Sequence, residues 1–138
     1  MKKQAGFSLI ELVFSVAIMG LLMAMMLPQL GRVRDQAMET SVKAVAMNFQ
    51  TALESYAAEN YQYPDSSYPA ADLAGALIDA GIMTTVPLNP FTQKTYLSAD
   101  QMGRISYAAV ASGLGYVLTA YKRDGSTVLL TIAGGTQS

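Results

Sequence analysis

The chain has 138 residues, so it can form one small domain together with whatever a long helix adds to it. Nine basic and ten acidic side chains nearly cancel, and such a balance gives no electrostatic footprint for binding nucleic acid. The sequence contains neither Cys nor His, which excludes disulfides, thiol chemistry, imidazole catalysis and the commonest zinc sites. We therefore expect a protein that is not an enzyme, with no catalytic residue and no cofactor.

The N-terminal region consists of a basic leader followed by an apolar segment. Lys2 and Lys3 precede an apolar run from Phe7 to Leu27, and a helix needs about 20 such residues to span a bilayer. The two lysines should stay on the cytoplasmic side. The best small-x-small cleavage site, residues 15–17, lies inside the apolar run rather than after it. Removal of this segment as an ordinary signal peptide is therefore not expected.

Glu11 is the unusual residue of the apolar segment. An ionised carboxylate at the centre of a bilayer costs roughly 2.5 to 3.5 kcal/mol on insertion scales, so something should compensate it. One explanation places Glu11 close enough to the cytoplasmic interface to reach water. The other begins with cleavage after Gly6, which would give Phe7 an α-ammonium group four residues before Glu11. The residues alone leave both explanations open.

The sequence KKQAGFSLIELV, residues 2–13, resembles the class III signal of type IV pilins and pseudopilins. Its features are a short basic leader, Gly6, an aromatic residue and a glutamate four positions after that aromatic residue. Gly20 and Pro28 lie where this family commonly has helix-weakening residues. The resemblance is strong for residues 1 to about 60 and only architectural beyond them.

This resemblance implies processing by a prepilin peptidase, an aspartic protease of the inner membrane. The peptidase would cleave after Gly6, once the chain is inserted, and methylate the new amino group of Phe7. In the family, the residue that corresponds to Glu11 assists docking by pairing with the N-terminal amine of a neighbouring subunit. One helical turn spans about 5.4 Å, so Glu11 could also reach the amine of its own Phe7. We favour the intermolecular pair during assembly and leave the final filament open.

A single long helix is predicted from Phe7 to about Asn60, roughly 80 Å at 1.5 Å per residue. Its first half, residues 7–30, is hydrophobic, and its second half, residues 31–60, is amphipathic. The apolar stripe of the second half recurs at spacings of three and four: Met38, Val42, Val45, Phe49, Leu53 and Tyr56. This stripe should pack against a head domain. The first half has no partner in its own chain, so we expect it to lie in lipid or against copies of itself.

Gly20 and Pro28 are predicted to weaken this helix. Pro28 cannot donate a hydrogen bond to the carbonyl of Ala24, and Gly20 adds backbone freedom. In filaments of the family the helix often loosens between such a glycine and proline, so we expect residues 20–28 to loosen there. The alternative is a simple kink in an anchor helix, because both residue types are tolerated in transmembrane helices.

Residues 61–138 are predicted to form a globular head, after a leader of residues 1–6 and the long helix. The helix should end before Pro64, since the residue preceding a proline is disfavoured in helical conformation. A short helix is expected over residues 71–80 and a β-meander over residues 105–132. A long helix packed on a small antiparallel sheet of about three strands is an α+β architecture, and it is the pilin fold.

The loop aspartates Asp65, Asp100 and Asp124 are isolated in the sequence, so no metal site is assigned. Calcium remains the alternative, because the major pseudopilins of type II secretion commonly bind it in a C-terminal loop.

The preferred interpretation is a structural subunit of a type IV pilus filament, used for adhesion, twitching motility or DNA uptake. The alternative is a pseudopilin of a type II secretion system, and a less favoured one is a monomeric membrane-anchored binding module. The resemblance implies four partners: other copies of the chain in a helical homopolymer, the prepilin peptidase, an inner-membrane assembly platform, and the membrane before assembly. The expected location is the bacterial inner membrane for the precursor, followed by an extracellular pilus or a periplasmic pseudopilus.

Overall fold

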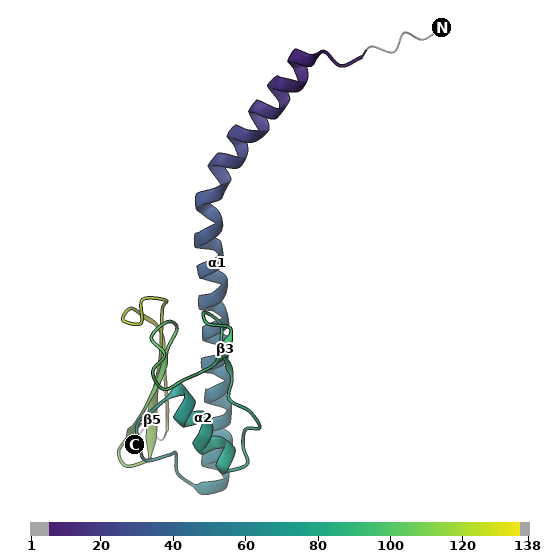
Figure 1. Cartoon of the computed structure of the whole chain (residues 1–138). Coiled ribbons are helices and arrows are strands. Elements are labelled where there is room, and N and C mark those ends of the chain that lie inside the picture. Colours follow the sequence, from purple (N-terminus) through teal and green to yellow (C-terminus); the bar gives the residue numbers. More distant parts are fainter. Residues whose placement is uncertain (1–5, 136–138) are drawn as a thin grey trace. The chain divides into compact units, whose positions relative to one another are not determined.

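The structure is a computed structural model that describes residues 6–135 (Figure 1). Its elements in chain order are α1 (Leu9–Asn60), β1 (Tyr68–Pro69), α2 (Ala70–Asp79), β2 (Leu88–Asn89), β3 (Lys94–Thr95), β4 (Ile105–Val110), β5 (Gly115–Tyr121) and β6 (Val128–Gly135). The chain divides into two compact units, and the second unit begins at Ala37. We call this second unit the C-terminal unit.

The N-terminal unit is built on the first part of α1. The helix begins at Leu9, two residues after its predicted start, and the carbonyl of Ser8 accepts hydrogen bonds from the N–H groups of Glu11 and Leu12 at 3.0 and 3.2 Å. Every large apolar side chain between Phe7 and Val33 is at least 54% exposed. This part of the helix therefore leaves its whole apolar surface uncovered within the chain.

In the C-terminal unit, α1 buries one stripe against the rest of the unit. The buried side chains of this stripe are Val42, Ala46, Phe49, Ala52 and Leu53. Met38, Val45 and Tyr56, which the apolar pattern also included, are only half-buried. Ala46 and Ala52 were not predicted to belong to the stripe, although a small side chain lets the facing layer approach the helix closely.

The facing layer is an antiparallel sheet with the strand order β1-β4-β5-β6. Its central register aligns Tyr107 of β4 with Leu118 of β5, and Leu118 with Ile132 of β6. The sheet thus contains the expected three-stranded meander, with β6 extended to Gly135 and the two-residue strand β1 added at the edge of β4. The α+β fold class, with a long N-terminal helix packed on a small antiparallel sheet, is confirmed.

A cluster of tyrosines joins the sheet to the end of α1. The rings of Tyr107 and Tyr116 stack with centroids 6.0 Å apart, and Tyr63 meets Tyr116 edge-on at 4.8 Å. The hydroxyl of Tyr107 donates to the carbonyl of Pro64 at 2.6 Å, and that of Tyr116 donates to Glu54 Oε1 at 3.0 Å. Burial raises the pKa of both phenols above its usual value. Each buried hydroxyl is thus paired, as buried polar groups must be.

The connection formed by residues 86–104 is held together by hydrogen bonds of the buried Asn89. The side-chain amide of Asn89 donates to Asp100 Oδ2 at 3.0 Å and to the carbonyl of Met102 at 2.9 Å. Its Oδ1 accepts the N–H of Phe91 at 3.0 Å. Asn89 is also the last residue of β2, which pairs with β3 in a short hairpin. One fully buried amide therefore replaces the regular hydrogen bonding that a longer strand would supply.

Several hydroxyl groups on the exposed side of α1 are bonded to the helix itself. Ser41, Thr51 and Ser55 donate to the carbonyls four residues earlier, at 3.1, 3.1 and 3.0 Å. Ser15 does the same in the N-terminal unit, at 2.8 Å. These side chains have their donors satisfied without water.

Candidate assembly site

The predicted cleavage site lies in open backbone before α1. Gly6, Phe7 and Ser8 are exposed and precede the helix, and the ring of Phe7 is 80% exposed. A side chain added at Gly6 would have no described atom within 4 Å. The remaining leader residues, Lys2 and Lys3 among them, lie outside the described part of the chain. The peptide bond between Gly6 and Phe7 is exposed, so a protease could bind the backbone on both sides of it. Cleavage after Gly6 and methylation of Phe7 stay predictions.

Glu11 occupies the first turn of α1. An acidic side chain there interacts favourably with the helix dipole, by about 0.3 to 1 kcal/mol. The spacing from Ser8 to Glu11 is that of a capping box, in which the third helical residue is a glutamate. Glu11 therefore has a local reason to stand at this helix end in addition to the charge pairing expected for assembly. Its pairing with an N-terminal amine stays a prediction.

Gly20 and Pro28 both lie inside α1, and the residues on either side of them are helical. Pro28 has no N–H, so the ladder of the helix lacks one bond at Ala24. Within the described residues, a Cβ at Gly20 would meet nothing within 4 Å. Packing inside one chain thus does not require glycine at this position. Loosening of residues 20–28 in a filament stays a prediction.

The apolar part of α1 is long enough and apolar enough to cross a membrane, by length and composition. No residue of its most apolar 18-residue stretch is buried by the rest of the described chain. A helix buried in the core of a soluble protein can be equally long and apolar. The apolar part of α1 differs from such a helix because its side chains are exposed.

The loop aspartates direct their oxygens at neighbouring backbone and hydroxyl groups. Asp124 accepts hydrogen bonds from the hydroxyl and N–H of Thr127 and from the N–H of Ser126, which lower the pKa of its carboxyl to about 2. Asp100 accepts from Asn89 and from the N–H of Leu97. In residues 6–135, no three acidic side chains gather into a group that could hold a metal ion. Both aspartates are explained by the turns that they close.

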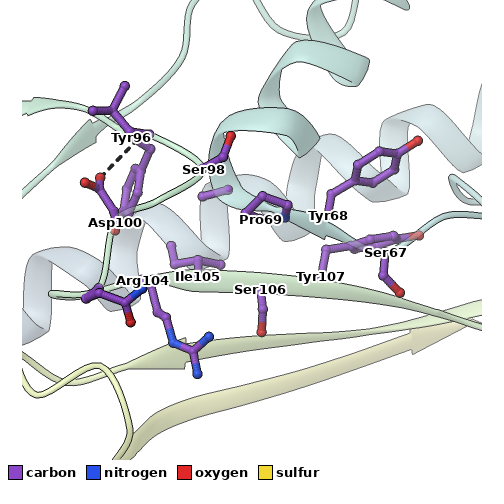
Figure 2. Close-up of a pocket in the computed structure, with 13 residues that line it drawn as sticks. Ser67, Tyr68, Pro69, Tyr96, Ser98, Asp100, Arg104, Ile105, Ser106 and Tyr107 are labelled. Atoms are coloured by element: carbon purple, nitrogen blue, oxygen red, sulfur yellow. Dashed lines mark hydrogen bonds between the residues drawn. The ribbon is translucent and has the colours of Figure 1, made fainter.

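A cavity of about 310 Å³ lies between β1, β4 and the loop before β4 (Figure 2). Its charged lining residues are Asp100 and Arg104. The guanidinium of Arg104 lies 4.0 Å from the centre of the Tyr121 ring, and its Nε donates to the carbonyl of Gly125 at 2.7 Å. Figure 2 shows Asp100 bonded within its own loop. Both charged groups of this cavity are thus engaged with neighbouring groups of the fold.

The sequence interpretation missed the distribution of charge along the C-terminal unit. Between Ala44 and Gln93 there is no lysine or arginine, whereas the same stretch contains Glu54, Glu59, Asp65, Asp72 and Asp79. The signal was readable in the sequence as a long segment with charges of one sign. Whether these charges form one surface depends on which loops lie together at each end of the folded unit, and the sequence alone does not show this.

An uncovered apolar N-terminal helix joined to a small α+β unit, preceded by an open glycine–aromatic bond, defines a pilin-like protein. Residues 1–27 match the prokaryotic N-terminal methylation motif. The chain is 37% identical over 65 residues to type II secretion system core protein G of Pseudomonas aeruginosa, which covers 47% of this chain and 46% of that protein. It is 25% identical over 114 residues to type II secretion system core protein G of Aeromonas hydrophila, covering 75% of this chain and 80% of that protein. No solved structure is significantly similar to the chain.

The chain thus spans less than half of the Pseudomonas protein in that match and most of the Aeromonas protein. With the N-terminal motif and the fold described above, these matches show that the chain is similar to type IV pilins and type II secretion pseudopilins.

Proposed function

We propose that this chain is a structural, non-enzymatic subunit of the pseudopilus of a type II secretion system. The observation that carries the proposal is the helix surface from Phe7 to Val33, whose large apolar side chains are all at least 54% exposed. Such a surface is stable only in lipid or against other apolar helices. A chain whose helix lies first in lipid and later against other apolar helices is a membrane-inserted precursor that becomes a filament subunit.

The pseudopilus is favoured over the type IV pilus, which the sequence interpretation preferred. Both curated relatives are type II secretion system core proteins. A monomeric binding module is less well supported, because a simple anchor has no need of a helix that continues as the core element of its own folded unit.

The proposed sequence of events follows from the N-terminal segment. The precursor inserts in the inner membrane with its leader on the cytoplasmic side, and a prepilin peptidase cleaves after Gly6 and methylates Phe7. Residues 7–30 then leave the lipid and pack in the filament core, while residues 31–60 support the folded unit. Glu11 pairs with the amine of a neighbouring chain on an inner-membrane assembly platform, and residues 20–28 loosen in the periplasmic filament.

Co-expression with a prepilin peptidase and the inner-membrane components of a type II secretion system tests this proposal. We expect the mature chain to begin at a methylated Phe7 and to be recovered in sheared filaments. Restored secretion in a strain that lacks its own core protein G would support the pseudopilus. Long surface fibres in a pilus-deficient strain, without restored secretion, would favour the pilus instead.

The role of Glu11 is tested by two substitutions that separate charge from helix capping. Glu11→Ala removes both, whereas Glu11→Gln keeps a capping acceptor and loses the charge. We expect both variants to insert in the membrane with the C-terminal unit folded, and both to give fewer filaments. Assembly of the Gln variant at the level of the parent chain would show that capping, and not charge pairing, is the function of this residue.

A further inference from the structure

The C-terminal unit has two ends that differ in the loops they contain (Figure 1). At one end α1 stops, and the N–H of Tyr63 donates to the carbonyl of Gly113 at 2.9 Å, which joins the segment after α1 to the turn between β4 and β5. At the other end Lys122 Nζ lies 3.9 Å from Glu39 Oε2, two helical residues after this unit begins. The turn between β5 and β6 is therefore level with the start of α1 in this unit. We call these the acidic end and the basic end, for the charges described next.

The acidic end contains Glu59 and Asp65, both exposed. Glu59 lies in the last turn of α1. All residues of this turn are described by the structure, and none of them is basic. The C-terminal end of a helix carries a partial negative charge that favours cations and disfavours carboxylates by about 0.3 to 1 kcal/mol. Glu59 is thus in an unfavourable position for an isolated chain. A cation supplied from outside the chain would reverse that effect.

The basic end contains Arg104, Lys122 and Arg123, close together through the pairing of β4 with β5. The N–H of Gly103 donates to the carbonyl of Lys122 at 3.1 Å, and Arg104 is held against Tyr121. Glu39, and Asp124 in the same turn as Lys122 and Arg123, offset part of this positive charge, and the Lys122 side chain is 44% exposed. Arg104 is therefore held in place by the fold, and the side chains of Lys122 and Arg123 reach the surface.

Each end also exposes apolar side chains among its charges. Tyr61 and Leu114 are exposed at the acidic end, and Met102 and Val128 at the basic end. Tyr61 is 92% exposed and has a φ of 59°, a left-handed conformation that is strained for a bulky side chain. A strained residue whose ring projects fully into solvent points to a role outside its own chain.

We propose that the acidic end of one copy docks on the basic end of a second copy, with Tyr61 and Leu114 packed against Met102 and Val128. The two surfaces are different, so the contact is heterologous and leaves one unpaired end on each chain. Repetition then extends an open assembly instead of closing a dimer. This contact rests on the proposed function, and it adds to that function a second interface beside the N-terminal helix. Its electrostatic part weakens as salt rises.

Charge reversal tests the contact in the full chain, expressed with the peptidase and secretion components. One variant combines Glu59→Lys with Asp65→Lys, and the other combines Lys122→Glu with Arg123→Glu. We expect each to reduce filament recovery several-fold, and a mixture of the two variants to restore it, because the first then carries two basic ends and the second two acidic ends. The matched control is Asp72→Lys, at the side of the unit in the first turn of α2, which should leave filament recovery unchanged.

Cross-linking provides an independent measurement, because the chain has no cysteine of its own. A chain with both Leu114→Cys and Val128→Cys should form a ladder of disulfide-linked multimers in oxidised filaments, whereas either single variant should stay monomeric. Filaments that form without a ladder, and that tolerate both charge reversals, would overturn this contact and leave the proposed function intact. Failure of the parent chain to form any filament would overturn both.

Discussion

The side chain of Glu54 should be a measurable link between α1 and the sheet. Its Oε2 accepts the hydroxyl of Tyr63 at 2.9 Å, and its Oε1 accepts the hydroxyl of Tyr116 at 3.0 Å. Tyr116 is only 1% exposed, so Glu54→Ala leaves its hydroxyl buried without an acceptor, at a cost of about 1 to 3 kcal/mol. Tyr63 is more exposed and can turn to water, so its lost bond costs about 0.5 to 1 kcal/mol. We expect a total loss of about 1.5 to 4 kcal/mol.

Thermal unfolding of the detergent-solubilised full chain measures this loss through the near-ultraviolet circular dichroism of the tyrosines. For a folded unit of about 100 residues, 1 kcal/mol corresponds to about 4 °C in Tm, so Glu54→Ala should lower Tm by about 6 to 16 °C. The matched control is Glu59→Ala, one turn later on the exposed surface. It removes an acid from the last helical turn and should leave Tm unchanged or slightly higher.

A double substitution separates the hydrogen bond from other effects of the alanine. In the Glu54→Ala background, Tyr116→Phe removes the stranded hydroxyl and should recover part of the lost stability. If Glu54→Ala melts within about 2 °C of the parent chain, or if the added Phe lowers Tm further, the carboxylate does not hold Tyr116 and the reasoning is wrong.

Three further predictions concern the same unit. Asn89→Ala strands the N–H of Phe91 and should make residues 86–104 the first site of limited proteolysis; an unchanged cleavage pattern would count against the brace. Gly103→Ala places a Cβ 2.6 Å from a ring carbon of Phe91 at a φ of +61° and should cost about 1 to 3 kcal/mol in thermal unfolding, whereas Gly75→Ala, with open space inside α2, should be neutral or stabilising. Burial raises the pKa of the buried phenols such as Tyr116, so the unfolded chain loses these protons first and stability should fall as pH rises above about 10. Ultraviolet titration of phenolate checks the last prediction, which fails if every tyrosine of the folded chain ionises together near its usual pKa.

The parts of the fold that follow from periodicity were predictable from the sequence. The stripe containing Val42, Phe49 and Leu53 repeats at helical spacing, and α1 buries these side chains. The β-meander was expected over residues 105–132, and the structure has β4, β5 and β6 there, with β6 continuing to Gly135. Strand β1 has only two residues, one of them Pro69, so it carries no period that could indicate a strand. The brace at Asn89 depends on a carboxylate and a carbonyl more than ten residues away, which no local pattern encodes.

The candidate assembly site was predictable in a different way. The residues from Gly6 to Glu11 were recognised as a motif, and the structure adds that this segment is exposed and that Glu11 stands at a helix start. The choice between pilus and pseudopilus was not readable there, because an apolar helix that moves from lipid into a filament needs the same chemistry in both machines. The relatives matched by the chain, rather than any residue of the motif, favour the pseudopilus.

The back-bonded hydroxyls of Ser41, Thr51 and Ser55 have a consequence for how a neighbour can lie along α1. Covering a polar side chain normally requires water to be stripped from it or a new partner to be found in a fixed direction. Here each hydroxyl already donates within the helix, so a neighbour that covers Ser41, Thr51 or Ser55 leaves no donor unpaired and needs no acceptor in a fixed direction.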